Sequence, residues 1–181
     1  MQPTPGRVSK RVWPPRGGRI LFTLLLILCL GGVAEAANTP DWTLRDENGR
    51  SVRFSEALKS GPVLVSFWAL WCAPCLKELP HIDALAAEFA DEITVLAVNA
   101  DTQRSVARVR PYLRSKGYEV TVPLDTAGEV ARKLQIGNAI PFTVLYDADG
   151  KEFYRHTGYK EGDERELRAQ IEALLAREPG R

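Results

Sequence analysis

The stretch PVLVSFWALWCAPC, residues 62–75, decides the fold. Its first seven residues form a short apolar run rich in β-branched side chains, which is typical of a buried central strand. Cys72 and Cys75 follow directly, and the residues after them repeat apolar side chains at helical spacing. These side chains are Leu79, Ile82, Leu85, Ala86 and Phe89. We therefore expect a strand, a short loop and then a helix over residues 72–90, with Pro80 bending the helix.

Strands and helices alternate on both sides of this segment. Turn sequences rich in Asp, Asn and Gly join two pairs of strand-like segments, which predicts hairpins of 42–45 with 51–54 and of 141–146 with 151–156. The other expected elements are strands at 93–98 and, more weakly, 120–124, and helices at 55–58 (capped by Ser55), 102–116 (bent at Pro111), 129–134 and 163–176. This order predicts an α/β fold: a mixed central sheet flanked by helices on both faces, with an N-terminal β-hairpin.

The first 36 residues have the pattern of an export signal. Five basic residues precede position 20, an apolar run covers residues 20–33 at most, and the small-residue site Ala34-Glu35-Ala36 follows. The run is shorter than the roughly 20 residues that a membrane-spanning helix needs, so we expect a cleaved signal peptide over residues 1–36. An uncleaved anchor that tethers the protein through the apolar run is the alternative. Lipid attachment at Cys29 is disfavoured by the bulky Leu28 before it.

Residues 37–181 are expected to form one exported domain. They carry 19 basic and 22 acidic side chains, a weakly negative balance that gives no reason to expect a nucleic-acid partner. Their length suffices for a single hydrophobic core. Only Cys72 and Cys75 remain in this part of the chain, and an oxidising compartment would permit a disulfide between them.

The position of Cys72, between a buried strand and a helix, predicts redox chemistry. A sulfur there lies beside unpaired backbone N–H groups and the positive end of the helix dipole, which favours the thiolate that attacks disulfides. Cys75, one turn further on, is in reach to resolve the mixed disulfide. A purely structural bridge is disfavoured because closing so short a loop contributes only about 2 kcal/mol. Zinc would need more ligands than His81 and His156 supply, and we expect His81 to be an ordinary helix residue.

Two motifs resemble the thioredoxin superfamily. Residues 67–75, Phe-Trp-Ala-Leu-Trp-Cys-Ala-Pro-Cys, are similar to its active-site segment, and residues 140–143, Ile-Pro-Phe-Thr, are similar to its cis-proline loop. With the element order, the resemblance covers roughly residues 40–178. It implies a thioredoxin-like fold and a cis peptide bond that leaves the backbone before the proline free to pair with an extended substrate. The expected substrate-binding residues are Trp71, Ala73, Pro74, Ile140 and Pro141.

The exported TlpA-like and ResA-like branch of the superfamily is the most similar. Its motif continues past the second cysteine as x-x-Glu-x-Pro, here residues 76–80. Cytosolic thioredoxins carry a buried Asp in the strand before the dithiol, where this chain has Ser66. The resemblance suggests Glu78 as the substitute proton acceptor, and a spacing of three residues places Glu78 on the same helical face as Cys75. The alternative is that Glu78 is a solvated helix carboxylate.

The resemblance implies a periplasmic or otherwise extracytoplasmic thiol:disulfide oxidoreductase, with Cys72, Cys75 and Glu78 as catalytic residues. The Ala-Pro pair between the cysteines favours a reductase, fed by a membrane thiol donor and needing no cofactor beyond the redox-active disulfide. By resemblance, its protein substrates would be apocytochrome c or the cysteines of a copper site. An oxidase or isomerase direction and a copper chaperone remain alternatives. A peroxidase is disfavoured because Ala69 stands where such enzymes place Thr or Ser.

Overall fold

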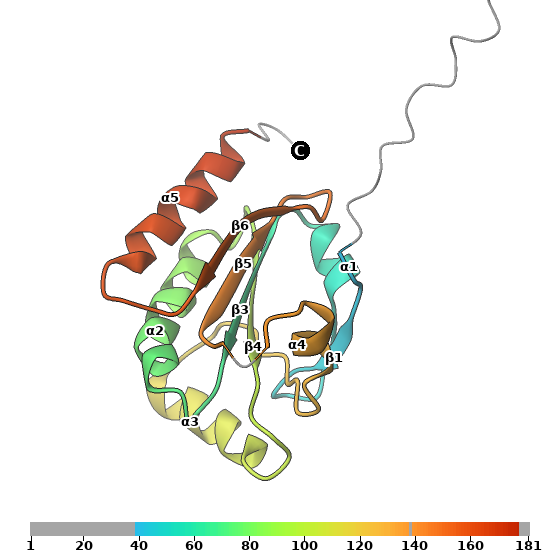
Figure 1. The fold of residues 1–181 in the computed structure, drawn as a ribbon, viewed down its shortest axis with the longest axis vertical. Helices are drawn as coiled ribbons and strands as arrows, with labels where there is room; N and C mark the ends of the chain where they lie inside the picture. Colours follow the sequence, from blue (N-terminus) through green and yellow to red (C-terminus); the bar gives the residue numbers. More distant parts are fainter. Residues whose placement is uncertain (1–38, 138, 178–181) are drawn as a thin grey trace, which may run out of the picture. The chain divides into compact units, whose positions relative to one another are not determined.

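The central sheet has four strands in the order β4-β3-β5-β6 (Figure 1). The structure is a computed structural model, and it describes residues 39–137 and 139–177. The middle strand β3 (Val63–Trp68) pairs in parallel with β4 (Thr94–Asn99) and antiparallel with β5 (Phe142–Tyr146). β6 (Glu152–Thr157) pairs antiparallel with β5 and forms one edge. The mixed sheet expected from the sequence is therefore confirmed.

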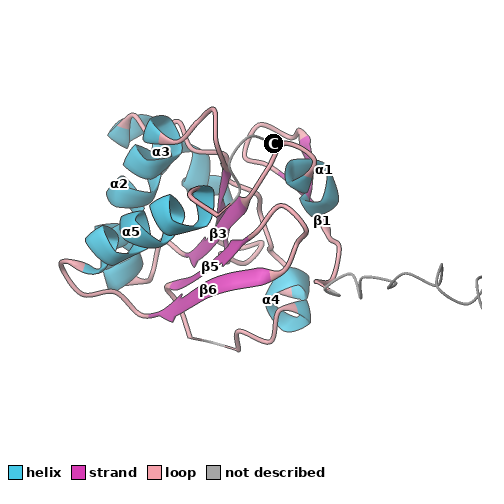
Figure 2. Ribbon diagram, turned by 90° about the horizontal axis from the view of Figure 1, so that it is seen from above, coloured by secondary structure: helices cyan, strands magenta, loops and turns pink. Residues whose placement is uncertain are grey.

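Helices cover both faces of this sheet. α2 (Ala73–Glu88), α3 (Val109–Lys116) and α5 (Asp163–Leu175) lie over one face (Figures 1 and 2). The other face carries α1 (Phe54–Leu58), α4 (Glu129–Lys133) and the antiparallel pair of β1 (Thr43–Arg45) with β2 (Ser51–Arg53). The predicted N-terminal hairpin and the three-layer arrangement are thus both present.

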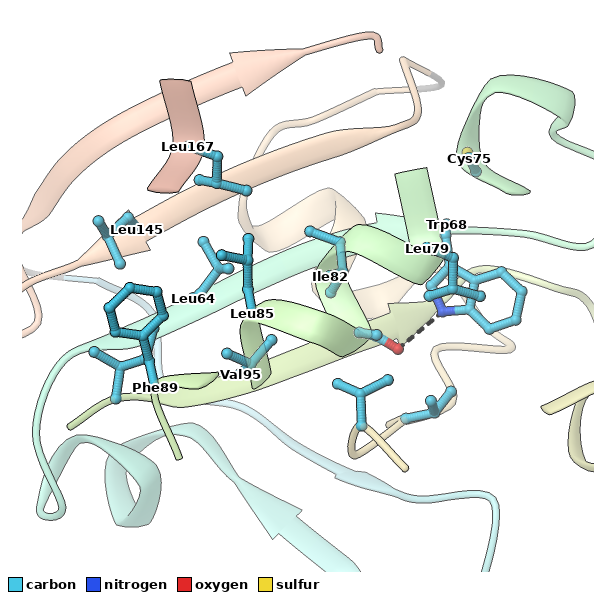
Figure 3. Packing of buried hydrophobic residues seen from close by; sticks show 14 of the residues in the cluster. Leu64, Trp68, Cys75, Leu79, Ile82, Leu85, Phe89, Val95, Leu145 and Leu167 are labelled. Carbon is cyan, nitrogen blue, oxygen red and sulfur yellow. Dashed lines mark hydrogen bonds between the residues drawn. The ribbon is translucent and has the colours of Figure 1, made fainter. Parts of the chain in front are cut away.

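Alternation along β3 divides the hydrophobic core in two. Every residue of β3 is buried, and successive side chains point to opposite faces. Leu64 and Trp68 join the core under α2 and α5, whereas Val63, Val65 and Phe67 join the core on the side of α1 and α4. The first core is drawn in Figure 3, where the Trp68 indole N–H donates to the Ala97 carbonyl at 3.0 Å. Ser66 is the polar member of the face under α2.

The chain departs from the sequence predictions at two helix starts. Asp41, not Ser55, caps α1: its carboxylate accepts from the Ser55 backbone N–H and hydroxyl, both at 3.0 Å. The segment expected as one helix over 102–116 is a 3₁₀ turn at Val106–Arg108 followed by α3. Pro111 lies in the first turn of α3, where its missing N–H has no helical partner to lose, so it marks the start of the helix.

The segment at 120–124 pairs more weakly than a full strand. It forms isolated bridges from Thr121 to Leu96 and from Leu124 to Asn99, which extend the sheet beside β4. Two backbone N–H groups at its start, those of Glu119 and Val120, donate to the Asp83 carboxylate on α2. In the part of the chain that the structure describes, no helix has the length and apolar character needed to cross a membrane.

Candidate active site

Cys72 and Cys75 are joined by a disulfide at the start of α2. Cys72 is the N-cap of the helix, and the Cys75 backbone N–H donates to its sulfur at 3.3 Å. The Cys72 side chain is 5% exposed and that of Cys75 is fully buried. A sulfur at an N-cap receives hydrogen bonds from orphan helix N–H groups, so its anionic form is stabilised there. Of the two cysteines, only Cys72 retains any exposed surface.

The cis-proline loop lies against the dithiol. The Ile140–Pro141 peptide bond is cis, as the resemblance implied, and the Ile140 carbonyl oxygen is 3.7 Å from the Cys72 sulfur. β5 begins immediately afterwards and pairs with β3, which leads into the dithiol. Cys72 and Ile140 are 68 residues apart in the chain, and the antiparallel pairing of β3 with β5 brings the two motifs together.

The loop between β3 and the dithiol is tied to the end of β4. The Asp101 carboxylate accepts from the Leu70 backbone N–H at 2.8 Å and from the Asn99 side-chain amide at 3.0 Å. The Ala100 N–H donates to the Trp68 carbonyl at 2.8 Å. Asp101 is completely buried, and its second carboxylate oxygen has no hydrogen-bond partner. Sequence reasoning missed Asp101, because its partner lies 31 residues away and no local motif marks the contact.

Glu78 is buried, not solvated, and its charge is penalised there. Its side chain is 5% exposed. Burial raises the pKa of this carboxyl to about 7, a hydrogen bond from Thr143 opposes the rise, and the charge of Asp163 adds to it. The Thr143 hydroxyl lies 3.3 Å from the Glu78 carboxylate and 3.2 Å from the Ser66 hydroxyl. The Thr143 hydroxyl thus lies between Glu78 and Ser66, which occupies the position of the buried Asp of cytosolic thioredoxins.

The predicted substrate-facing residues surround Cys72. Trp71 is 64% exposed, and among the described residues it is the large hydrophobic residue that lies open to solvent. Ala73 and Pro74, close to it in the chain, are also exposed. Ile140 is half-buried and Pro141 is buried. The site thus offers an aromatic and aliphatic surface around a nearly covered sulfur.

His81 lies closer to the site than the sequence suggested. It lines a small cleft over Glu78 together with residues of β5, β6 and α5, and its ring stacks on Tyr159. The spacing of three residues from Glu78 could have indicated this, but the partners from β6 and α5 could not be read from the sequence. Across residues 39–137 and 139–177, no group of three or more His, Cys, Asp and Glu side chains is placed to hold a metal ion.

Comparison with known proteins identifies the family. Residues 36–152 match the AhpC/TSA family. The chain belongs to this family. This AhpC/TSA chain is 35% identical to the thioredoxin-like protein YneN of Bacillus subtilis over 94 residues, which are 51% of this chain and 54% of YneN. It is 31% identical to the thiol-disulfide oxidoreductase ResA of the same organism over 120 residues, 66% of this chain and 65% of ResA. The matches thus span about half of YneN and just under two thirds of ResA.

Solved structures confirm the fold of this AhpC/TSA chain. A candidate thiol:disulfide interchange protein DsbE from Chlorobium tepidum has a TM-score of 0.68 and 31% identity, over 76% of this chain and 94% of that one. The thioredoxin-like fold is therefore confirmed, and the ResA-like and DsbE-like relatives support the branch expected from the sequence. The expected signal peptide lies outside the described residues.

Proposed function

We propose that this protein is an exported thiol:disulfide oxidoreductase that reduces disulfides in other proteins. The observation that carries the proposal is the setting of Cys72: a helix N-cap sulfur beside a cis Ile140–Pro141 bond, with Cys75 buried behind it. The names of ResA and DsbE support the same activity. Cys72 is the nucleophile, Cys75 the resolving residue and Glu78 the proton acceptor.

The reaction consists of two thiol–disulfide exchanges. The Cys72 thiolate of the reduced protein attacks a substrate disulfide, forms a mixed disulfide and releases the other substrate sulfur as a thiolate. Cys75 then gives its proton to the Glu78 carboxylate, and its thiolate attacks the Cys72 sulfur and releases the second substrate sulfur. Two electrons have passed to the substrate, whose thiolates take protons from water. The protein is left with the Cys72–Cys75 disulfide.

The proposal also covers the direction of the reaction, the electron donor and the protein substrates. Pro74 between the cysteines is the residue that reducing thioredoxins carry there, so we propose a reductase. A reductase outside the cytosol needs an electron donor, for which we propose a membrane thiol carrier. By resemblance to the branch, the substrates are apocytochrome c or the cysteines of a copper site. Trp71 and the Ile140 backbone would bind the polypeptide around the substrate disulfide.

Turnover assays test the activity and its direction. With dithiothreitol as donor, we expect the full chain to reduce the disulfides of insulin, Cys72→Ser to abolish this reduction, and Cys29→Ser to leave it unchanged. The oxidised protein should introduce disulfides into a reduced protein such as ribonuclease much more slowly than the reduced protein removes them. Equal insulin reduction by the wild type and by Cys72→Ser would exclude the enzyme. Faster oxidation than reduction would reverse the direction.

A further inference from the structure

A cleft connects buried Glu78 with the molecular surface between α2, β6 and α5. It is narrow, with a volume of about 10 Å³, roughly the space of one water molecule. Its polar lining is Glu78, His81, Thr143, His156, Asp163 and Glu164, and Ile82, Tyr154 and Leu167 complete it. Such a concentration of ionisable side chains contrasts with the apolar core on the same face of the sheet. The two exchanges at the dithiol give no role to the side chains from β6 and α5.

Two residues that line the cleft, Thr143 and His156, belong to a polar row that crosses the sheet. Ser66 on β3 is opposite Thr143 on β5, and Thr143 is opposite His156 on β6. Because paired residues point to the same face, the three polar side chains run from the middle of the sheet to its edge. Ser66 and Thr143 are buried, whereas His156 is partly exposed. Thr143, the middle member of the row, is within 3.3 Å of Glu78, and the row ends at the partly exposed His156.

Two groups on β6 and α5 meet at the outer end of this row. His156 Nε2 is 3.2 Å from an oxygen of Asp163, and the side chains of His156 and Asp163 are 32% and 28% exposed. Asp163 is the first residue of α5 and also accepts from the Lys160 backbone N–H at 2.7 Å. Its charge acts on Glu78 and raises the pKa of that carboxyl. Asp163 thus contacts the histidine and influences the buried acid.

We propose that Glu78 exchanges its proton with solvent through this cleft. His156 carries the proton toward solvent, and Asp163 regulates the exchange through its contact with His156 and its charge. The inference rests on the proposed role of Glu78. After Glu78 has taken the proton of Cys75, the proton leaves along the polar row to the His156 imidazole and then to water, and the Glu78 carboxylate is regenerated for the next cycle. No electrons move in this step.

The charges that face Glu78 decide when it can act as a base. Asp163 and Glu164 approach from α5, His81 from α2, Tyr154 and His156 from β6, and the hydroxyl of Thr143 from β5. Asp163 opposes ionisation of Glu78, because two carboxylates at one site disfavour each other's charge. Removing the Asp163 charge without changing its shape should therefore make Glu78 more acidic.

The resolving step gives a direct readout. When the reduced protein reacts with 5,5′-dithiobis(2-nitrobenzoate), attack by Cys72 releases the first thionitrobenzoate and attack by Cys75 releases the second, and Cys29→Ser in every variant removes the third thiol. The rate of the second release should rise with pH to a midpoint near 7 in the wild type. In Asp163→Asn the midpoint should fall by about half a pH unit. Glu172→Gln, which removes a charge from the exposed face of α5, is the matched control and should follow the wild-type profile.

The histidine is tested by chemical rescue. His156→Ala should slow multiple-turnover insulin reduction several-fold at pH 7, because the proton leaves Glu78 only after the resolving step, and free imidazole in the buffer should restore the rate, which a merely structural loss would not allow. Superimposable pH profiles of Asp163→Asn and wild type, or a His156→Ala rate that imidazole leaves unchanged, would overturn the proposal. Glu78→Gln distinguishes a failure of the proposed function from a failure of this inference. If the midpoint persists in Glu78→Gln, the proposed role of Glu78 is wrong. If Glu78→Gln abolishes the midpoint but Asp163→Asn leaves the midpoint at its wild-type value, only the proposed role of the cleft residues is wrong.

Discussion

At Glu78 the fold holds a carboxyl group in surroundings that disfavour its charge. Glu78 belongs to α2, and burial of its side chain together with the charge of Asp163 raises its pKa from an ordinary 4.5 to about 7. A raised carboxyl pKa means that the folded protein binds this proton more tightly than the unfolded chain does. The stabilisation is complete below pH 4.5 and is lost as the pH rises through 7. Near neutral pH Glu78 is therefore a base with substantial affinity for a proton, which suits its proposed role of taking one from the Cys75 thiol.

Glu78→Gln should stabilise the oxidised protein at alkaline pH. With a pKa of about 7 in the folded protein and 4.5 in the unfolded chain, ionisation of Glu78 lowers the free energy of unfolding by about 3 kcal/mol at pH 8 and about 1 kcal/mol at pH 5. The uncharged Gln side chain avoids this loss. Urea denaturation of the wild type and the variant at both pH values measures the gap. A variant that is no more stable than the wild type at pH 8 would contradict the buried, charge-penalised setting of Glu78.

The residues proposed as catalytic were predicted because a local motif marks them, whereas their surroundings could not be predicted. Cys72, Cys75 and Glu78 lie within seven residues, and the resemblance suggested a role for each. Thr143, His156 and Asp163 line one cleft with Glu78 because of strand register and the packing of α5, which no single stretch of sequence encodes. The sequence did indicate where to look, since Ser66 occupies the place of a missing carboxylate.

Among the elements, the short loop from β3 to α2 depends on the end of β4. Asp101 is the acceptor that fixes Leu70, two residues before Cys72. Asp101→Ala should lower stability by about 2 kcal/mol, because it leaves buried donors unpaired, and should also slow the attack of Cys72 on a disulfide. The first release of thionitrobenzoate, measured under conditions where the protein is fully folded, reports this attack.

Asp46→Ala is the control for Asp101. Asp46 is also buried and accepts hydrogen bonds from the Asn48 and Arg50 backbones, but it holds the turn between β1 and β2. We expect a comparable loss of stability with no change in the first release. Equal rates for the two variants would mean that Asp101 has no special role in positioning the dithiol.

Element boundaries show where sequence patterns were insufficient. The apolar periodicity located α2 and α5 closely, because a long amphipathic helix has several turns over which the pattern repeats. The start of α1 was assigned to Ser55, whereas the capping group comes from Asp41, 14 residues upstream. The 102–116 helix was overextended because its first turns have few apolar residues to distinguish a 3₁₀ turn and a loop from an α-helix.

For the whole molecule, one sheet joins two cores. Ile171 lies in the core under α5 and Phe54 in the core beside α1, and both are almost completely buried. Since every residue of β3 is buried and the strand contributes side chains to both cores, we expect the described domain to unfold as one unit. Ile171→Ala and Phe54→Ala should each lower its stability by about 3 kcal/mol in a single transition. Separate transitions by far-ultraviolet circular dichroism and tryptophan fluorescence would show two independent units.

The central claim is that Cys72 attacks the substrate and Cys75 resolves, and covalent trapping tests it most directly. In a Cys29→Ser background, reduced Cys75→Ser should form one mixed disulfide per chain with oxidised insulin. Mass spectrometry should locate it on Cys72, and dithiothreitol should release it. Cys72→Ser, which retains the buried Cys75, should form none. Trapping on Cys75 in the Cys72→Ser chain, or no adduct in the Cys75→Ser chain, would contradict the account.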